Sequence, residues 1–278
     1  MMKSVRGKNV LITGGAMGMG RLFAERAIAE GAAAVVLWDI NETALNETLA
    51  ELADGPSELS GYIVDLGDAE EIAATAADVR DDLGHIDILV NNAGIVRGNA
   101  YFWETDPVRD TAATIDVNTL APMHVAHEFL LGMINAQGEA RMLNLASAAG
   151  FTPNPRMAVY AASKWAVIGW SDSVRLELKQ AGHEHVKVTT VCPYYVGTGM
   201  FEGAKSAPLL PILDPHEVVE EAWTAMLEGS PFVVLPKTVM LSEMLKGVVP
   251  IGVRDFIADH VIGVYHTMDE FTGRPTKA

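Results

Sequence analysis

The stretch NVLITGGAMGMGRLFAERAIAEG, residues 9–31, contains the unit from which the fold of the whole chain is predicted. Residues 9–13 form a short apolar run that is typical of a buried strand. Residues 20–31 have the apolar spacing of a helix, which ends at Gly31. A buried strand that passes through a glycine-rich turn into a helix is the building unit of a parallel sheet covered on both faces.

The same alternation continues along the chain. Further buried strands are predicted at 34–39, 59–65, 86–92, 140–147, 186–192 and 232–235. Helices are predicted at 41–53, 68–83, 106–136, 157–181 and 215–228. Strands joined by helical crossovers predict an α/β fold of the Rossmann type, a doubly wound, seven-stranded parallel sheet. We expect a single domain over 1–278, with a substrate loop at 194–213 and a tail at 236–278.

Composition excludes several classes of protein. The 278 residues include 20 Lys and Arg against 36 Asp and Glu, a net charge of −16, which disfavours nucleic-acid binding. The single cysteine, Cys192, cannot form an intrachain disulfide, so we expect a reducing, cytoplasmic location. The N-terminus lacks a signal-peptide pattern, and no apolar run reaches the roughly 18 residues that span a bilayer. No metal site is predicted.

The turn TGGAMGMG, residues 13–20, carries the first functional motif. Gly14, Gly18 and Gly20 follow the spacing G-x-x-x-G-x-G, with Met17 directly before Gly18 and Met19 directly after it. Glycine permits a tight turn and lets a pyrophosphate approach the N-terminus of the following helix. A glycine-rich turn alone is a weak signal, but its place directly after the first strand favours nucleotide binding.

Two acidic residues end the next two strands. Asp39 could accept hydrogen bonds from both ribose hydroxyls of the adenosine and repel a 2′-phosphate, which favours NAD over NADP. Alternatively it caps the next helix, although Asn41 could do so equally well. Asp65 could reach the adenine amino group or serve as a helix cap, and the residues do not separate these two roles. Their neighbours Ile40 and Leu66 are also candidate cofactor contacts.

The tetrapeptide NNAG, residues 91–94, follows the fourth strand. It places backbone and small side chains where a cofactor would cross the carboxyl edge of the sheet. By itself it could be only a turn. Asn92, Ala93 and Gly94 are therefore candidate cofactor contacts.

Four residues are candidates for catalysis. Tyr160 and Lys164 are four apart on one predicted helix, so both project from the same face. A tyrosine has an ordinary pKa of about 10, and a nearby ammonium and a cationic nicotinamide would lower it. Ser147 could hold the substrate oxygen while Tyr160 exchanges its proton. Asn118 lies in the preceding long helix. Each of these residues alone would more often be structural.

Together these motifs resemble the short-chain dehydrogenases/reductases of the single-domain branch. The resemblance rests on TGGAMGMG, NNAG, Asn118, Ser147 and YAASK (160–164), in that order, and covers roughly residues 5–235. It implies that Tyr160 is the acid/base, that Ser147 orients the carbonyl or hydroxyl, and that Asn118 holds a water of the proton relay. It also implies that Lys164 binds the nicotinamide ribose and lowers the pKa of Tyr160.

The segment PYYVGTG, residues 193–199, extends the resemblance. Pro193, Val196 and Thr198 would contact the cofactor, with Thr198 bonded to the carboxamide. The family usually has glycine directly after this proline, where this chain has Tyr194. That departure places Tyr194 and Tyr195 within reach of substrate or cofactor.

The tail resembles the C-terminal region of steroid and retinol dehydrogenases, which handle bulky lipophilic alcohols. Its apolar residues could cover a substrate pocket, meet another subunit or touch a membrane surface, with plain packing as the default. Side chains near the predicted active-site edge are candidates for an apolar pocket. They are Trp103, Ala149, Phe151, Tyr194, Tyr195, Met200 and Phe201.

These features predict an NAD-dependent oxidoreductase that interconverts a secondary alcohol and a ketone of an aromatic or bulky lipophilic small molecule. Two alternatives are a binding protein that senses NAD(H) without turnover and a nucleotide-sugar epimerase. The complete Asn, Ser, Tyr and Lys set argues against the first, and the glycine spacing and short C-terminal region argue against the second. The resemblance also implies a homotetramer, with the helices at 106–136 and 157–181 as candidate interfaces.

Overall fold

Seven parallel strands form one sheet in the computed structural model, which describes residues 2–136, 138–208, 210–246 and 248–273. The order is β3-β2-β1-β4-β5-β6-β7, so the chain winds outward from β1 in one direction and then from β4 in the other. The strands are β1 (Asn9–Thr13), β2 (Ala34–Asp39), β3 (Glu58–Ile63), β4 (Ile88–Asn91), β5 (Ala140–Leu145), β6 (Val186–Pro193) and β7 (Phe232–Leu235). The predicted fold class is confirmed.

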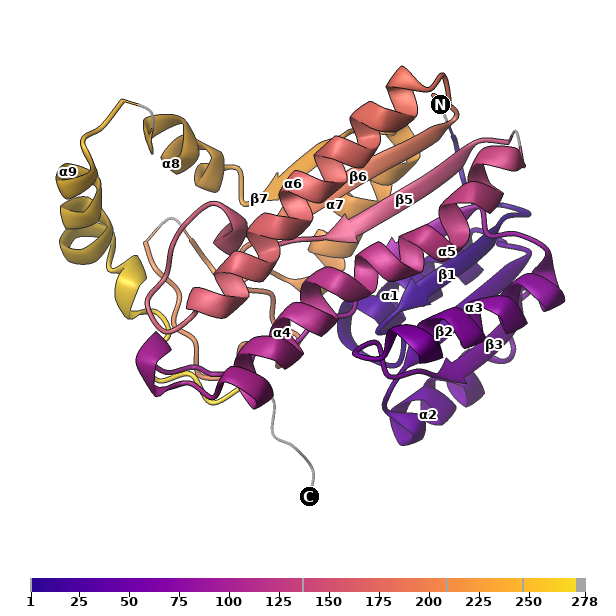
Figure 1. Ribbon diagram of the computed structural model, residues 1–278, viewed down its shortest axis with the longest axis horizontal. Helices are drawn as coiled ribbons and strands as arrows, with labels where there is room; N and C mark the ends of the chain where they lie inside the picture. Colours follow the sequence, from indigo (N-terminus) through magenta and orange to yellow (C-terminus); the bar gives the residue numbers. More distant parts are fainter. Residues whose placement is uncertain (1, 137, 209, 247, 274–278) are drawn as a thin grey trace.

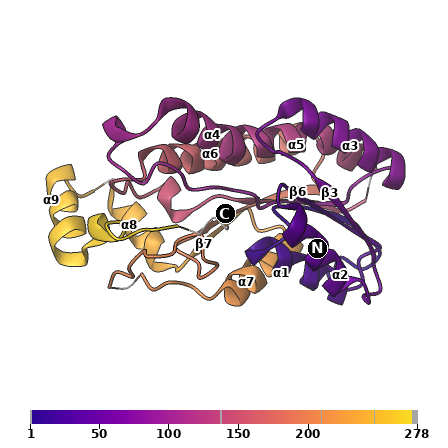
Figure 2. The same cartoon turned by 90° about the horizontal axis from the view of Figure 1, so that it is seen from below.

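Helices cover both faces of the sheet (Figure 1, Figure 2). One face carries α1 (Gly18–Ala29), α2 (Glu42–Leu52) and α7 (Pro215–Glu228). The other carries α3 (Ala69–Leu83), α4 (Ala113–Ile115), α5 (Ala121–Asn135) and α6 (Ala158–Gln180). Two apolar clusters fill the space between sheet and helices, one on each face, which is why the central strands are apolar without alternation.

The sheet positions the candidate active site, because the strand order changes direction between β1 and β4. These neighbouring strands pair in parallel from Val10 with Ile88 to Ile12 with Val90, so their carboxyl ends lie at one edge. In open α/β sheets, ligands bind outside that edge at the point where the order reverses. The turns after β1, β4 and β5 all leave the sheet there.

Several predicted strands extend one or two residues too far. β3 ends at Ile63, β4 at Asn91 and β5 at Leu145. Asp65, Asn92 and Ser147 consequently lie in the turns that follow these strands and not in the strands themselves.

The predicted helix at 106–136 is helical over most of its length but irregular. It contains two π-helical segments, η2 (Pro107–Ala112) and η3 (Asp116–Leu120), on either side of α4. A π-helical segment inside a helix is uncommon and is frequent at functional sites. Asn118 lies within η3, and the apolar periodicity of the sequence gave no sign of this change in winding.

The chain after β7 adds helices and, over the described residues, no further strand. It forms α8 (Thr238–Lys246), α9 (Ile251–Phe256), the π-helical η5 (Ile257–Ile262) and the 3-10 turn η6 (Val264–His266). The segment beyond η6 returns to the body of the protein, where the Asn99 amide donates to Met268 O. Within the described part of the chain, no helix is long and apolar enough to cross a bilayer. Residues 1 and 274–278 of the predicted domain lie outside the described residues.

Candidate active site

The glycine turn after β1 is held by backbone hydrogen bonds to the neighbouring strands. Gly14 N donates to Trp38 O at 2.8 Å, and the Asn92 amide donates to Thr13 O at 2.9 Å and to Gly14 O at 3.1 Å. A Cβ on Gly20 would lie 1.9 Å from Gly14 O, so no other residue fits there. NNAG therefore does more than turn the chain, because Asn92 fixes the glycine turn from the adjacent strand.

The first of the two acidic candidates is not a helix cap. Asn41 caps α2 by accepting from Ala44 N. Asp39 instead accepts from Ala16 N at 3.0 Å and from Asn41 N at 2.9 Å, so its carboxylate is fixed beside the glycine turn. Its neighbour Ile40 is exposed.

Asp65 is not a helix cap either. Asp68 caps α3, whereas Asp65 accepts from Gly67 N at 2.8 Å within the turn after β3. Asp65 is exposed, and the adjacent Leu66 is buried in the core on that face of the sheet.

The four catalytic candidates come together at the carboxyl edge of the central strands. Ser147 follows β5, and Tyr160 and Lys164 lie one turn apart on α6. Both are buried, with 5% and 4% of their surface exposed. Ser147 Oγ lies in hydrogen-bond reach of the phenol. Lys164 Nζ donates to Leu145 O at 2.9 Å and lies 5.8 Å from the centre of the Tyr160 ring.

Asn118 connects this group to the turn after β4. Its side chain accepts from Ile95 N at 2.8 Å and donates to Ile95 O at 2.9 Å, as a neighbouring strand would. It also donates to Ser163 Oγ at 3.2 Å. Both amide protons and one acceptor position of the side chain are thus used within the protein, and the side chain holds the segment after NNAG against α6.

Burial dominates the electrostatics of the site. It raises the pKa of Tyr160, an effect that the hydrogen bond from Ser147 partly opposes. It also lowers the pKa of Lys164 to about 8, while Cys192 acts weakly in the other direction. The lowering of the Tyr160 pKa by Lys164, which the resemblance implies, stays a prediction. The ammonium is bonded to Leu145 O.

The segment after β6 closes one side of the site. Val196 pairs with Leu213, and Leu213 N donates to Tyr195 O at 2.8 Å, so the two ends of the predicted substrate loop are tied together. Pro193 is the last residue of β6, and its carbonyl faces Ser147 Oγ at 3.4 Å. Thr198 follows in the turn at Val196 to Gly199, partly exposed.

A cavity of about 240 Å³ opens beside Ser147. Its inner wall comes from the end of β5, the segment before α6 and the start of the substrate loop. Its outer wall comes from the tail. The lining residues from the inner side are Ser147, Ala148, Ala149, Thr152, Pro153, Asn154, Met157, Tyr194, Tyr195, Pro208 and Leu210. Those from the tail are Thr238, Val239, Lys246, Val249, Arg254, Ile257, Ala258, Ile262, Val264 and Tyr265.

Three of the seven predicted pocket residues line this cavity: Ala149, Tyr194 and Tyr195. Phe201 lies just behind it, with its ring against Tyr160 at 5.9 Å and Tyr195 at 4.9 Å between ring centres. Phe151 packs against Phe232 instead, and Met200 is partly exposed in the neighbouring turn. Neither of these last two is among the lining residues.

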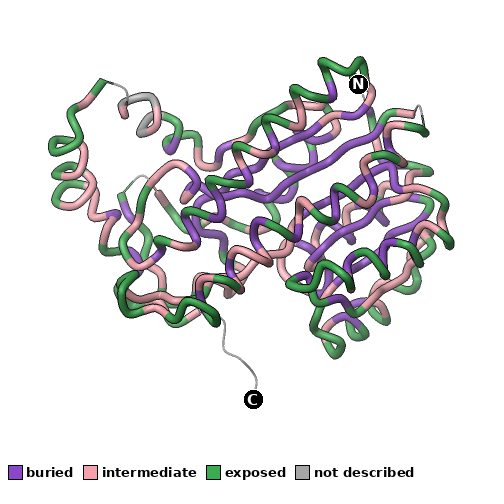
Figure 3. The backbone as a smooth tube through the Cα atoms, viewed as in Figure 1, coloured by how far each residue is buried: buried purple, intermediate pink, exposed green. Residues whose placement is uncertain are grey.

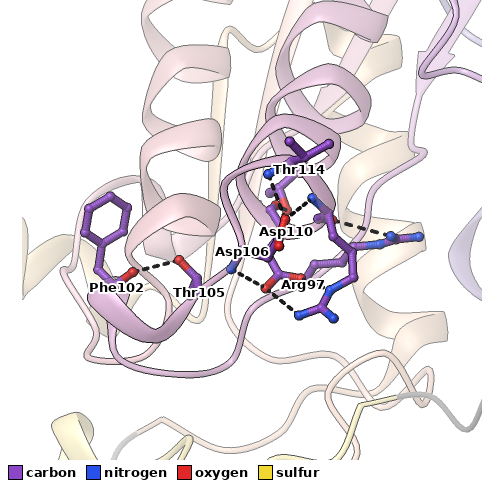
Figure 4. A network of polar contacts seen from close by, with 8 residues as sticks. Arg97, Phe102, Thr105, Asp106, Asp110 and Thr114 are labelled. Carbon is purple, nitrogen blue, oxygen red and sulfur yellow. Dashed lines mark hydrogen bonds and ion pairs between the residues drawn. The ribbon is translucent and has the colours of Figure 1, made fainter.

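Trp103 lies outside the cavity, with 78% of its surface exposed and its ring stacked on Tyr101. It belongs to the 3-10 turn η1 (Phe102–Glu104), which precedes a polar network shown in Figure 4. There Asp110 accepts from Asp106 N and from Arg109, and Arg109 lowers the pKa of its carboxyl. This network fixes the start of η2 (Figure 4).

The sequence did not point to the residues that join the tail to the cavity. Asn154 donates to the hydroxyls of Tyr195 at 2.8 Å and Thr267 at 3.1 Å, although 113 residues separate it from Thr267. Neither residue stands in a motif or in a periodic pattern. Only the path of the tail back across the molecule brings them together.

Comparison with known proteins identifies the family. The short chain dehydrogenase family matches residues 8–208. Epidermal retinol dehydrogenase 2 of Mus musculus is 37% identical over 279 residues, which cover 99% of this chain and 88% of that protein. Estradiol 17-beta-dehydrogenase 11 of Homo sapiens is 34% identical over 248 residues, which cover 89% of this chain and 81% of that protein.

Two solved structures have the same fold. A short chain dehydrogenase/reductase from Burkholderia phymatum in complex with NAD has a TM-score of 0.80 at 26% identity, over 88% of this chain and 95% of that one. A metagenomic short-chain oxidoreductase in complex with NADP has a TM-score of 0.69 at 28% identity, over 84% and 97%. With the glycine turn, the seven-stranded sheet and the Ser147, Tyr160 and Lys164 group, the matches show that the chain belongs to the short-chain dehydrogenases/reductases, a family of oxidoreductases.

Proposed function

We propose that the protein is an NAD-dependent oxidoreductase that interconverts a secondary alcohol and a ketone on a bulky lipophilic molecule. The observation that carries this proposal is the cavity beside Ser147, whose lining is mainly apolar and whose outer wall is the tail. The names of the relatives, a retinol dehydrogenase and an estradiol dehydrogenase, agree with a lipophilic alcohol as the substrate.

The residues present fit a nicotinamide dinucleotide. Gly20 lets the backbone of α1 pack closely against Gly14, and the turn leads directly into the N-terminus of α1, a helix of 12 residues whose first amides suit a pyrophosphate. Asn92, Ala93 and Gly94 border the path across the sheet edge. Among the described residues, the Lys164 ammonium makes one hydrogen bond, to Leu145 O, and an ammonium has three protons to donate. When bound, the nicotinamide accepts or gives the hydride.

Asp39 supports NAD as the cofactor rather than NADP. Its carboxylate is held by Ala16 N and Asn41 N at the point where the adenosine ribose of a Rossmann cofactor lies. A 2′-phosphate there would meet a fixed negative charge. Neither Met17 nor Ile40, the adjacent side chains, supplies a positive one.

Tyr160 would move the proton. In the oxidation of an alcohol, its phenolate takes the hydroxyl proton as the carbon loses hydride; in the reverse direction the phenol returns that proton to the ketone oxygen. Ser147 would donate to the same substrate oxygen and hold it in place. Lys164 would grip the ribose and, through its positive charge, favour the phenolate.

Replacing Tyr160 with Phe tests the assignment. We expect turnover of aryl and alicyclic alcohols, followed by NAD reduction, to fall by roughly 100-fold or more, because removal of a general acid/base costs about that factor. Cofactor affinity, measured by titration of NADH fluorescence, should stay within about threefold, since the ring remains. Tyr62→Phe removes a surface phenol that donates to Asp82 and serves as the control. Full turnover by Tyr160→Phe would overturn the proposal, and NADH binding without turnover by the wild-type chain would favour an NAD(H) sensor.

We also propose a homotetramer in a reducing, cytoplasmic compartment. Support for assembly comes from large apolar side chains exposed on η3, α5 and α6: Leu120, Leu131, Trp165 and Leu176. Sedimentation of the wild-type chain and of Leu131→Glu measures the oligomeric state. The free, buried thiol of Cys192 is compatible with a reducing location, which cell fractionation tests.

A further inference from the structure

We propose that the substrate carries an anionic group, a carboxylate, at the end away from its reacting carbon, and that Lys246 and Arg254 bind that group. This inference rests on the proposed function and narrows its substrate class. It concerns the outer wall of the cavity, which is formed by α8, α9 and η5 and stands apart from the sheet in Figure 1.

The charges on the cavity wall differ in sign from those of the whole protein. The chain has 36 acidic and 20 basic residues, yet the charged side chains among the described lining residues are two cations, Lys246 and Arg254. Within the described part of the wall there is no Asp or Glu. An acidic protein that places only cations on the wall of an apolar cavity is suited to a negatively charged ligand.

Each cation has an acidic partner that lies off the cavity wall. Lys246 Nζ is 2.6 Å from Glu243 Oε2, and Arg254 donates through Nε and Nη2 to Asp255 Oδ1 at 3.1 and 2.9 Å. Neither Glu243 nor Asp255 lines the cavity. In both ion pairs, therefore, the positive member faces the space that a substrate would fill.

The surroundings of Lys246 leave it ready to bind an acceptor. Its ammonium is buried and makes no hydrogen bond of acceptable geometry with a described residue, despite its closeness to Glu243. It lies 5.1 Å from the centre of the Trp165 ring, and Trp165 Nε1 donates to Ala149 O. Glu243 pairs with this ammonium, but an ammonium has three protons to donate, so a ligand carboxylate could accept from Lys246 as well.

Arg254 is held more firmly. The Asp255 oxygen that accepts from it also accepts from the Tyr265 hydroxyl at 3.0 Å, and Tyr265 itself lines the cavity. The guanidinium is thus held by Asp255, which is itself bonded to Tyr265 of η6. A carboxylate buried among apolar side chains needs such fixed positive groups, because an unpaired buried charge is strongly disfavoured.

A matched pair of ligands tests the inference: (ω−1)-hydroxydodecanoate, a secondary alcohol with a distant carboxylate, and its methyl ester. We measure binding by calorimetry with the NADH-loaded protein and turnover by NAD reduction. The wild type should prefer the acid by roughly 10-fold or more, the range of a hydrogen bond to a charged group. Lys246→Met should remove most of that preference, Lys246→Arg should retain it, and Arg254→Gln should act in the same direction as Lys246→Met.

Glu243→Gln should have the opposite effect on the preference for the acid. It removes the charge that competes with the ligand for Lys246, so acid binding should tighten while ester binding stays constant. Lys237→Met and Arg175→Gln, which change residues that do not line the cavity, should leave the preference unchanged.

The outcomes separate this inference from the proposed function. Equal binding of acid and ester by the wild type, or a preference that Lys246→Met and Arg254→Gln leave unchanged, overturns the anionic anchor whatever the activity. Tight, Lys246-dependent binding of the acid without oxidation of any alcohol supports the anchor and contradicts the proposed function.

Discussion

The glycine turn after β1 and the tail after β7 both border the candidate active site, but different parts of the fold hold them. The turn is fixed by short hydrogen bonds at the ends of adjacent strands, such as Gly14 N to Trp38 O and the Asn92 amide to Thr13 O. The tail is fixed by backbone and side-chain contacts to loops outside the sheet, such as Lys205 N to Thr267 O and the Thr267 and Tyr195 hydroxyls 3.1 Å apart. We call the first region the proposed cofactor side and the second the proposed substrate side.

Burial shows the same contrast. The strands that lead to the glycine turn are buried along almost their whole length, and the tail helices are largely exposed (Figure 3). On the outer side of the tail, Val248 and Ile251 expose 82% and 67% of their surface. Segments with few buried contacts open at lower free energy than the core does. We expect the tail to move before the sheet does.

Gly20→Ala has the largest expected effect among the variants that test the difference between the glycine turn and the tail. Its Cβ would lie 1.9 Å from Gly14 O, so the turn must deform. We expect NADH affinity to fall by more than about 100-fold, because backbone contacts to the pyrophosphate are lost together. Fluorescence titration measures this. Gly169→Ala in α6, whose Cβ would meet nothing within 4 Å, should instead stabilise the fold by about 0.5–1 kcal/mol. Unchanged NADH binding in Gly20→Ala would remove the turn from the cofactor site.

Lys164→Met tests the cost of burying a charge on the cofactor side. Burial lowers the pKa of Lys164 from 10.5 to about 8, so the ammonium destabilises the fold at neutral pH. Allowing for the lost bond to Leu145 O, we expect the variant to be about 2 kcal/mol more stable at pH 7, and inactive.

The sign of the pH dependence follows from linkage. Between about pH 8 and 10.5 the unfolded chain binds more protons at Lys164 than the folded chain, so the wild type gains stability with rising pH. The advantage of the variant should therefore shrink across this window in denaturant titrations. Lys179→Met, at an exposed position of the same helix, should show no such trend. A constant advantage would contradict the lowered pKa.

Asp39→Ser probes cofactor choice. Loss of the fixed carboxylate should shift the ratio of kcat/KM for NAD over NADP by roughly 10- to 100-fold toward NADP, the range of one charged hydrogen bond. The comparison variant is Asp65→Ser, which alters an exposed carboxylate after β3 and should affect both cofactors equally. If the ratio stays constant in Asp39→Ser, Asp39 does not select NAD.

Thr267→Val has the smallest expected effect and touches the substrate side alone. Its hydroxyl contacts Asn154, Tyr195 and Val264 O. We expect KM for a lipophilic alcohol to rise about threefold and unfolding free energy to fall by about 1 kcal/mol, with NADH affinity unchanged. Thr272→Val, at an exposed site, provides the matched control. Weakened NADH binding would show that the two sides are coupled.

Much of the cofactor side could be predicted from the sequence. TGGAMGMG, Asp39 and NNAG each start at the last residue of a strand, and parallel strands bring their carboxyl ends to one edge. The separation of Tyr160 and Lys164 by one helical turn places them together for the same reason of regular geometry. Periodicity missed the π-helical winding around Asn118, because that winding changes hydrogen bonding without changing the apolar pattern.

The substrate side was decided by tertiary structure. Trp103 and Tyr194 are both aromatic and close to the predicted edge, yet one is exposed and the other lines the cavity. Lys246 and Arg254 belong to none of the motifs described above. Their place on the cavity wall follows from the return of the tail across the molecule, which depends on contacts between residues more than 100 positions apart. Local sequence determines strands, turns and helices; long-range side-chain packing determines what the enzyme can hold.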